Sequence, residues 1–104
     1  MRTLLHPTSK ELSLPTVLYA LGDPWRLRIV EQLTAADEAI SCGNLEGIEE
    51  VPKSTGSHHF KVLRESGLIR MVPQGRRILV SLRREDLEER FPGLLKAILQ
   101  TYQR

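Results

Sequence analysis

Apolar residues recur at helical spacing in two segments of the N-terminal third. The first runs from Thr16 to Leu21 and the second from Pro24 to about Ala35. The pair Asp23-Pro24 predicts the start of the second helix, because an aspartate accepts hydrogen bonds from free N–H groups at a helix start and proline is tolerated at the first helical position. The residues predicted on the polar side of this helix are Arg26, Arg28, Glu31 and Gln32.

Glycine and proline divide the middle of the chain into short elements. Breaks at Gly43, Gly47 and Pro52 predict a short helix over about 42–48, a turn at 49–51 and a longer helix that opens at Pro52 and ends at Gly67. Residues at positions 56, 60 and 63 form a small or apolar face of the longer helix, whereas its opposite face is short, polar and basic. This order of elements predicts a helix-turn-helix, whose second helix enters the DNA major groove.

After Gly67 the hydrophobic period changes from 3.6 to 2. The segments 68–72 and 78–82 predict a β-hairpin with a turn at 73–75 and arginines at its tip. A hairpin placed directly after such a helix is the wing of a winged helix, and its arginines can reach phosphates or a neighbouring minor groove. The expected fold class is therefore mainly α with a small β-hairpin, with about five helices and a two-stranded wing.

A second strong helical stripe closes the chain, with an expected kink or restart at Pro92-Gly93. A domain of this size cannot easily bury these additional apolar residues in its own core. We therefore expect a second copy of the chain to cover them, which predicts a homodimer. The predicted interface residues are Leu18, Leu94, Leu95, Ile98, Leu99 and Tyr102. Residues 1–15 are predicted to form an arm that packs through its leucines at positions 4, 5, 12 and 14 or stays loose, and residues 16–104 one domain.

Composition narrows the class of protein. The chain has 104 residues, of which 40% are hydrophobic and 27% charged, as in an ordinary globular domain. Its longest apolar run, residues 17–21, is far shorter than a membrane span, and no signal peptide is evident. A single cysteine, Cys42, excludes an intrachain disulfide and fits a reducing compartment. We expect a soluble cytoplasmic protein.

Charge is unevenly distributed along the chain. Residues 53–84 contain eight basic residues and one acidic residue, whereas residues 1–52 contain four basic and eight acidic residues. A basic segment in an otherwise acidic domain indicates a surface for a polyanion, and double-stranded DNA is the expected partner. The predicted contact residues are Lys53, Ser54, Thr55, Ser57, His58, Lys61, Arg64, Arg76 and Arg77. The alternative is a winged-helix module whose basic face binds an acidic protein.

Three other residues have structural interpretations beside functional ones. His59 lies near the packed face of its helix, so a half-buried structural imidazole is favoured over a base contact. Trp25 belongs either to the core or to a small-ligand pocket. Cys42 is favoured as an inert thiol over a redox sensor. No catalytic triad, phosphate loop or metal motif is evident, so we expect neither an enzyme nor a cofactor.

Three segments together resemble the ArsR-type winged-helix transcriptional regulators. These are the Asp-Pro-Trp-Arg-Leu run at 23–27, the Ser-His-His-Phe run at 57–60 and Gly75-Arg76-Arg77 at the hairpin tip. The resemblance covers about residues 16–100. It implies a homodimer built from the first and last helices that binds a palindromic operator, represses transcription and is released by an inducer, often a metal ion.

The sequence departs from that family at its metal sites. The segment around Cys42 has one thiol where the best-known metal sensors have a Cys-x-Cys pair, and the last helical region has carboxylates but no histidine. Transition metals prefer imidazole or thiolate ligands, so we expect no metal site. Several alternatives remain for how repression is controlled: an unknown small-molecule effector, redox chemistry at Cys42, a metal ion, or the expression level of the protein alone.

Overall fold

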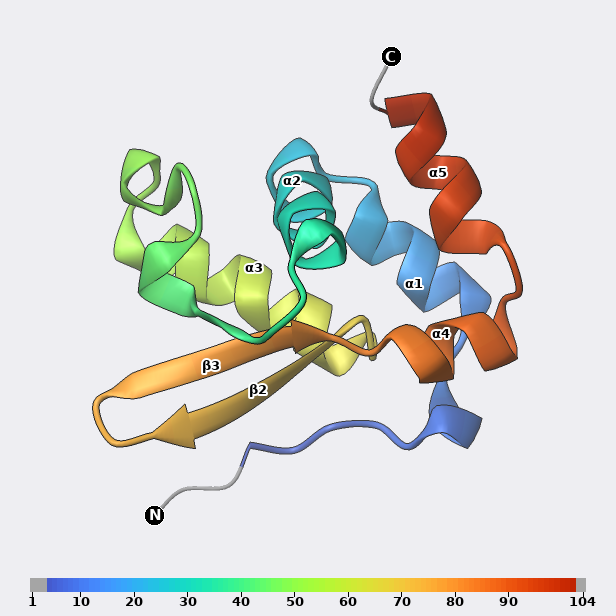
Figure 1. The fold of residues 1–104 in the computed structure, drawn as a ribbon, viewed down its shortest axis with the longest axis horizontal. Coiled ribbons are helices and arrows are strands. Elements are labelled where there is room, and N and C mark those ends of the chain that lie inside the picture. Colours follow the sequence, from blue (N-terminus) through green and yellow to red (C-terminus); the bar gives the residue numbers. More distant parts are fainter. Residues whose placement is uncertain (1–3, 103–104) are drawn as a thin grey trace.

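The computed structural model describes residues 4–102, which contain five α-helices and one antiparallel sheet (Figure 1). The helices are α1 (Leu14–Leu21), α2 (Pro24–Ala35), α3 (Lys53–Glu65), α4 (Arg84–Arg90) and α5 (Leu94–Tyr102). The strands are β1 (Ile40–Ser41), β2 (Ile69–Gln74) and β3 (Arg77–Leu82), in the spatial order β1-β3-β2. The predicted fold class is confirmed, and β1 is an addition to it.

The start of α2 follows the capping chemistry of its sequence. Asp23 Oδ2 accepts hydrogen bonds from the backbone N–H groups of Trp25 at 2.9 Å and Arg26 at 3.1 Å. Pro24 occupies the first turn, where its missing N–H costs nothing. The helix then buries Ile29, Val30 and Leu33 against the core.

The prediction of a short helix over residues 42–48 is wrong. In its place the chain forms two 3₁₀ turns, Cys42–Asn44 and Ile48–Glu50. Gly47 separates them in the left-handed region, with φ of 79°, and an α-helix cannot pass through that conformation. Leu45 is buried between the two turns and fastens the segment to the core.

The β-hairpin is longer and its turn tighter than the sequence indicated. Gln74 pairs with Arg77, so only Gly75 and Arg76 form the turn. Gly75 has φ of 62° and no other residue of the turn has a positive φ, as expected for glycine at the first central position of a type II′ turn. The prediction placed Pro73 in the turn, but Pro73 pairs with Ile78 within the ladder. Proline is tolerated there because β2 is an edge strand.

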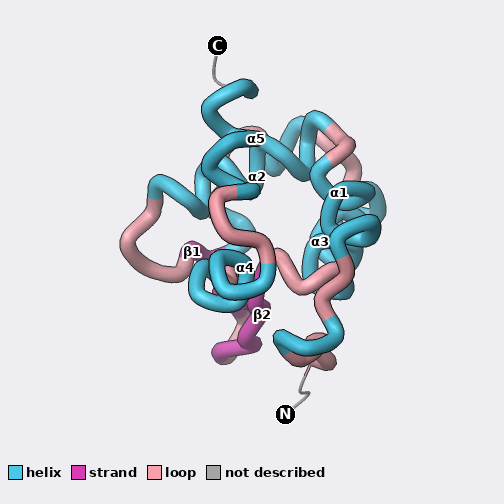
Figure 2. Tube along the Cα trace, turned by 90° about the vertical axis from the view of Figure 1, so that its right-hand side faces the viewer, coloured by secondary structure: helices cyan, strands magenta, loops and turns pink. Residues whose placement is uncertain are grey.

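Strand β1 was missed because two residues carry no readable periodicity. Ile40 pairs with Val80 and Ser41 with Leu79. The core lies where α1, α2 and α3 meet the sheet and α4 (Figure 2), and its fully buried residues include Ile29, Leu63 and Val80.

The N-terminal segment from residue 4 to 12 lies against the body of the domain. Leu12 is buried and Leu4 half-buried, whereas Leu5 and Leu14 are exposed. Of the two alternatives, packing through all four leucines or a loose arm, the structure supports packing, but through two of the four leucines only. His6 Nε2 accepts a hydrogen bond of 2.9 Å from the N–H of Met71 on edge strand β2. Residues 1–3 of the predicted arm lie outside the described part.

The sequence predicts either a kink or a restart of the C-terminal helical region at Pro92-Gly93, and the structure shows a restart. Helix α4 ends at Arg90 and α5 begins at Leu94, with Gly93 at φ of 76° between them. Helices α1, α4 and α5 lie on the side of the molecule opposite the β2–β3 turn (Figure 1). Within residues 4–102, no helix combines the length and apolar character that a bilayer crossing requires.

Candidate nucleic-acid interface

Helix α3 separates a packed face from a polar face. Its buried residues are Gly56, His59, Phe60 and Leu63. Six of the predicted DNA contacts are exposed on or beside the other face, namely Lys53, Ser54, Thr55, Ser57, His58 and Lys61. The short side chains of Ser54 and Thr55 leave the start of α3 open to close approach, and Lys61 adds a positive charge about two turns further on.

Two more of the predicted contacts lie at the hairpin tip. Arg76 and Arg77 are exposed, and Arg77 Nη2 donates a long hydrogen bond of 3.4 Å to Gln74 Oε1. The tip and the N-terminal end of α3 both extend away from α1, α4 and α5 (Figure 1). One end of the molecule thus presents two positively charged elements.

Three arginines of the basic segment donate hydrogen bonds to backbone carbonyls of the chain. Arg64 Nη1 donates to the carbonyl of Leu5 at 2.8 Å, and Arg83 Nη1 to that of Pro7 at 2.7 Å. Arg84 Nη2 donates to three carbonyls at the C-terminal end of α2, at 2.7–2.9 Å. The predicted contact Arg64 is therefore separated from the others and holds the N-terminal segment.

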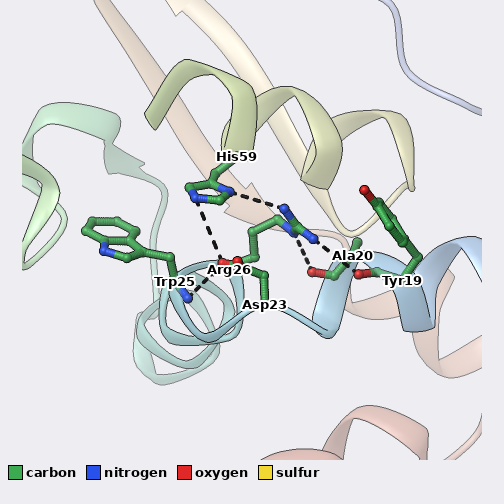
Figure 3. A network of polar contacts seen from close by, with 6 residues as sticks. All are labelled: Tyr19, Ala20, Asp23, Trp25, Arg26 and His59. Carbon is green, nitrogen blue, oxygen red and sulfur yellow. Dashed lines mark hydrogen bonds and ion pairs between the residues drawn. The ribbon is translucent and has the colours of Figure 1, made fainter. Parts of the chain in front are cut away.

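A buried polar network joins α3 to the α1–α2 corner (Figure 3). Arg26, expected on the polar side of α2, is 6% exposed. Its Nε donates to the carbonyl of Ala20 at 2.7 Å and its Nη2 to that of Tyr19 at 3.3 Å. These carbonyls lie in the last turn of α1, where helical acceptors lose their usual N–H partners. The Tyr19 carbonyl also accepts from the N–H of Gly22 at 3.1 Å, and Arg26 supplies a further donor to it and one to Ala20. Sequence pattern missed this role because the acceptors are backbone atoms six and seven residues away.

His59 completes the network from the α3 side (Figure 3). Its Nδ1 lies 3.2 Å from Arg26 Nη1, and because the guanidinium can only donate, Nδ1 accepts. Neutral His59 then carries its proton on Nε2, which lies 3.9 Å from Asp23 Oδ2. Trp25 stacks on the imidazole with ring centroids 6.3 Å apart and an interplanar angle of 4°.

The electrostatics of this site favour a neutral imidazole. Burial lowers the pKa of His59, the positive charge of Arg26 acts in the same direction, and Asp23 opposes both. The prediction of a structural imidazole is confirmed, and Trp25 packs against the core beside it. The network fixes how α3 sits on α2, and with it the direction of the polar face.

The residues predicted for a dimer interface divide into two groups. Leu18 on α1 and Tyr102 on α5 are 46% and 40% exposed. Leu94, Leu95 and Ile98 are half-buried, and Leu99 is 5% exposed in the single chain. The monomer therefore absorbs part of the stripe that the sequence assigned to a second subunit.

The described residues hold no group of three or more histidine, cysteine, aspartate or glutamate side chains placed to share a metal ion. Cys42 is half-buried in the 3₁₀ turn Cys42–Asn44. The absence of a metal site stays a prediction.

Comparison with known proteins identifies the class of this chain. A family model described as a helix-turn-helix domain matches residues 21–72. An uncharacterized HTH-type transcriptional regulator, YceK, of Bacillus subtilis strain 168 is 35% identical over 82 residues, which are 79% of this chain and 82% of that protein.

Solved structures extend the likeness to the whole fold. The transcriptional repressor BigR from Xylella fastidiosa is 27% identical, with a TM-score of 0.65 over 86% of this chain and 85% of that one. An ArsR family transcriptional regulator, RHA00566, is 21% identical and shares the fold, with a TM-score of 0.67 over 88% of this chain and 97% of that one. The chain belongs to the helix-turn-helix transcriptional regulators, which are DNA-binding proteins and not enzymes, and it has the winged-helix fold of the ArsR type.

Proposed function

We propose that this regulator acts as a homodimeric repressor that binds an inverted-repeat operator and holds no resident metal. The observation that carries the proposal is the division of the molecule into two ends. The polar face of α3 and the arginines of the hairpin tip occupy one end, and exposed apolar side chains of α1 and α5 occupy another.

At the DNA end, each side chain suits a particular contact. The hydroxyls of Ser54, Thr55 and Ser57 can bond phosphates or base edges, and Lys61 can bond guanine or a phosphate. Arg76 and Arg77 are long enough to follow a phosphate backbone or enter the minor groove beside it. Affinity then comes mainly from the cations, and site preference from α3.

At the opposite end, two features favour a second copy of the chain. Leu18 and Tyr102 are large, apolar and exposed. Beside Tyr102, an open apolar depression of about 470 Å³ lies between Leu27 of α2 and Ile98 of α5. A symmetric dimer through α1 and α5 would carry two α3 helices, which read half-sites about 34 Å apart, one turn of DNA.

Repression without a resident metal rests on the ligand chemistry. A dimer on an operator occupies DNA that polymerase needs, and the similar protein BigR is described as a transcriptional repressor. The residues that could ligate a metal near Cys42 and along the last helices are carboxylates and one thiol, a poor set for a transition metal.

The test is a fluorescence-anisotropy titration of the protein against the DNA upstream of its own gene and a scrambled control, at two salt concentrations. We expect tight binding to the native fragment only. If the dimer makes about 6–10 phosphate contacts, log K falls with log salt with a slope of about −5 to −9.

Equal and weak binding to both fragments, with a slope near zero, would contradict the proposal and favour a protein partner for the basic face. A pull-down with the same protein then identifies that partner. Binding to the native fragment that depends on added Zn²⁺, or is abolished by EDTA, would contradict the metal-free part alone.

A further inference from the structure

A second depression lies on the other side of α5, away from Leu27. It has a volume of about 450 Å³ and opens between the C-terminal end of α2, helix α4 and helix α5. Its floor is formed by Leu82, Leu87, Leu95 and Leu99. This volume is within the range of about 300–1,000 Å³ that is common for small-molecule sites.

This groove is distinct from the surface proposed for dimerisation. Neither Leu18 nor Tyr102, the exposed apolar residues of that surface, lines the groove, and Ile98 lines the depression beside Leu27 instead. Leu95 and Leu99, which the sequence assigned to the dimer interface, line the groove. Helix α5 thus has an apolar side that the proposed dimer does not need.

Charged groups around the rim favour an anion. The guanidinium of Arg84 lines the groove, and its three carbonyl partners on α2 hold its charge in place without neutralising it. Lys96 also lines the rim and has no ion-pair partner among residues 4–102. Glu88 is the one acidic residue of the lining, and its carboxylate accepts from the Gly93 N–H at 3.3 Å.

We propose that this groove binds a small amphipathic carboxylate, with its apolar body on the leucine floor and its carboxylate beside Lys96. Two cations against one occupied carboxylate leave the rim net positive, and an apolar body with one anionic end matches both parts of the lining. The ligand would contact α4, α5 and Leu82 at the end of β3. A role of the ligand as an effector of DNA binding rests on the proposed function, whereas binding of the ligand to the groove does not.

The experiment measures binding by calorimetry in the absence of DNA, with octanoate as the probe and 1-octanol and octylammonium as controls of equal chain length. We expect octanoate to bind more tightly than either control. Lys96→Gln should weaken octanoate binding about fivefold and leave octanol binding unchanged, as for loss of one exposed ion pair. Lys10→Gln, at a lysine outside the groove lining, is the matched control and should change nothing.

A second variant keeps the test independent of charge. Gln100→Trp adds bulk at an exposed position of the lining and should weaken the binding of octanoate and octanol alike. Failure of octanoate to bind, equal binding of octylammonium, or an unchanged affinity in both variants would overturn the proposal.

The link to regulation is tested separately by repeating the anisotropy titration with saturating octanoate. A ligand wedged between α4 and α5 should lower DNA affinity about fivefold or more, the usual lower range of allosteric coupling. Binding of octanoate without a change in DNA affinity would overturn the effector role. A protein that binds octanoate but no DNA would overturn the proposed function and leave the site in place.

Discussion

Asp23 serves two partners at the corner between α1 and α2. Its carboxylate caps α2 by accepting from two backbone N–H groups, and it faces the Nε2 of His59 on α3. A single side chain therefore controls both the start of one helix and the seating of the helix proposed to read DNA.

Replacing Asp23 separates these two roles. Asp23→Ala removes the cap and should lower the free energy of unfolding by about 0.5–2 kcal/mol, the usual cost of losing a capping side chain. Asp23→Asn keeps an equally good capping oxygen and should cost less than half as much. Urea denaturation followed by circular dichroism measures both variants, and equal losses would show that the charge, not the cap, matters.

The two histidines with shifted pKa values predict the direction of pH dependence. Burial lowers the pKa of His59 and of His6 below the ordinary value of 6.5. The unfolded chain then binds protons more readily than the folded chain. The contribution of these histidines to the free energy of unfolding is therefore fully present above about pH 6.5 and is lost as the pH drops toward the folded-state pKa values. His6 also loses its capacity to accept from Met71 when it is protonated.

We expect the urea midpoint to decrease between about pH 7.5 and about pH 5.5. His59→Gln should show a smaller decrease than the parent protein over the same range, and the His6→Gln, His59→Gln double variant a smaller one still. A pH dependence that is identical in all three proteins would mean that other groups control acid stability.

Some of these residue roles could be predicted and others could not. The cap of Asp23 and the structural role of His59 follow from short-range sequence signals. The roles of Arg26, Arg64 and Arg84 could not be predicted, because their acceptors are backbone carbonyls that any residue provides. Charge counting along the chain consequently overestimated the free basic surface.

At the scale of elements, Gly67 decides how α3 gives way to β2. It has φ of 86°, and a Cβ at this position would overlap the side chain of Leu12. The end of the proposed reading helix, the start of the wing and the N-terminal segment thus meet at one residue without a side chain.

Gly67→Ala should lower the free energy of unfolding by about 1–2 kcal/mol for the left-handed backbone alone, with a further loss from displacement of Leu12. Gly43→Ala is the matched control, since a Cβ there meets no atom within 4 Å. Calorimetry gives the melting temperature of each variant. A Gly67→Ala protein as stable as the control would mean that α3 and β2 can rearrange around this residue.

The wing is an element whose role can be tested apart from stability. Arg76→Ala with Arg77→Ala should weaken binding to all DNA sequences and reduce the salt slope by about 0.9 for each phosphate that the variant no longer neutralises. Arg70→Ala, on an exposed position of β2 away from the hairpin tip, is the control and should have a small effect. Undiminished affinity in the double variant would remove the wing from the interface.

Length explains which elements the sequence revealed. Helices α2 and α3, with 12 and 13 residues, have clear apolar faces and recognisable starts. The two-residue strand β1 and the 3₁₀ turns that replace the predicted helix over 42–48 are too short to carry a period. Their form depends on pairing with β3 and on the buried Leu45.

For the whole molecule, the exposed apolar residues of α1 and α5 bear on assembly. We expect the parent protein to elute as a dimer in size-exclusion chromatography with light scattering. Leu18→Glu should produce a folded monomer, because Leu18 is 46% exposed and the single chain does not need it. Since one α3 helix reads only one half-site, the monomer should also lose most of its operator affinity.

Leu5→Glu provides the matched control, because Leu5 is 83% exposed but lies on the N-terminal segment outside the proposed interface. It should remain a dimer. A dimeric Leu18→Glu protein with unchanged DNA affinity would place the subunit contact elsewhere.

The sequence by itself determined the class of the fold, the order of its long elements and the polar face of α3, because these depend on local periodicity and on capping and turn residues. Tertiary structure decided which arginines remain free, that Leu95 and Leu99 line a groove, and that a buried Arg26–His59 contact seats α3. The physical reason is that these outcomes depend on backbone carbonyls and surfaces distant along the chain, which folding brings together and no local pattern encodes.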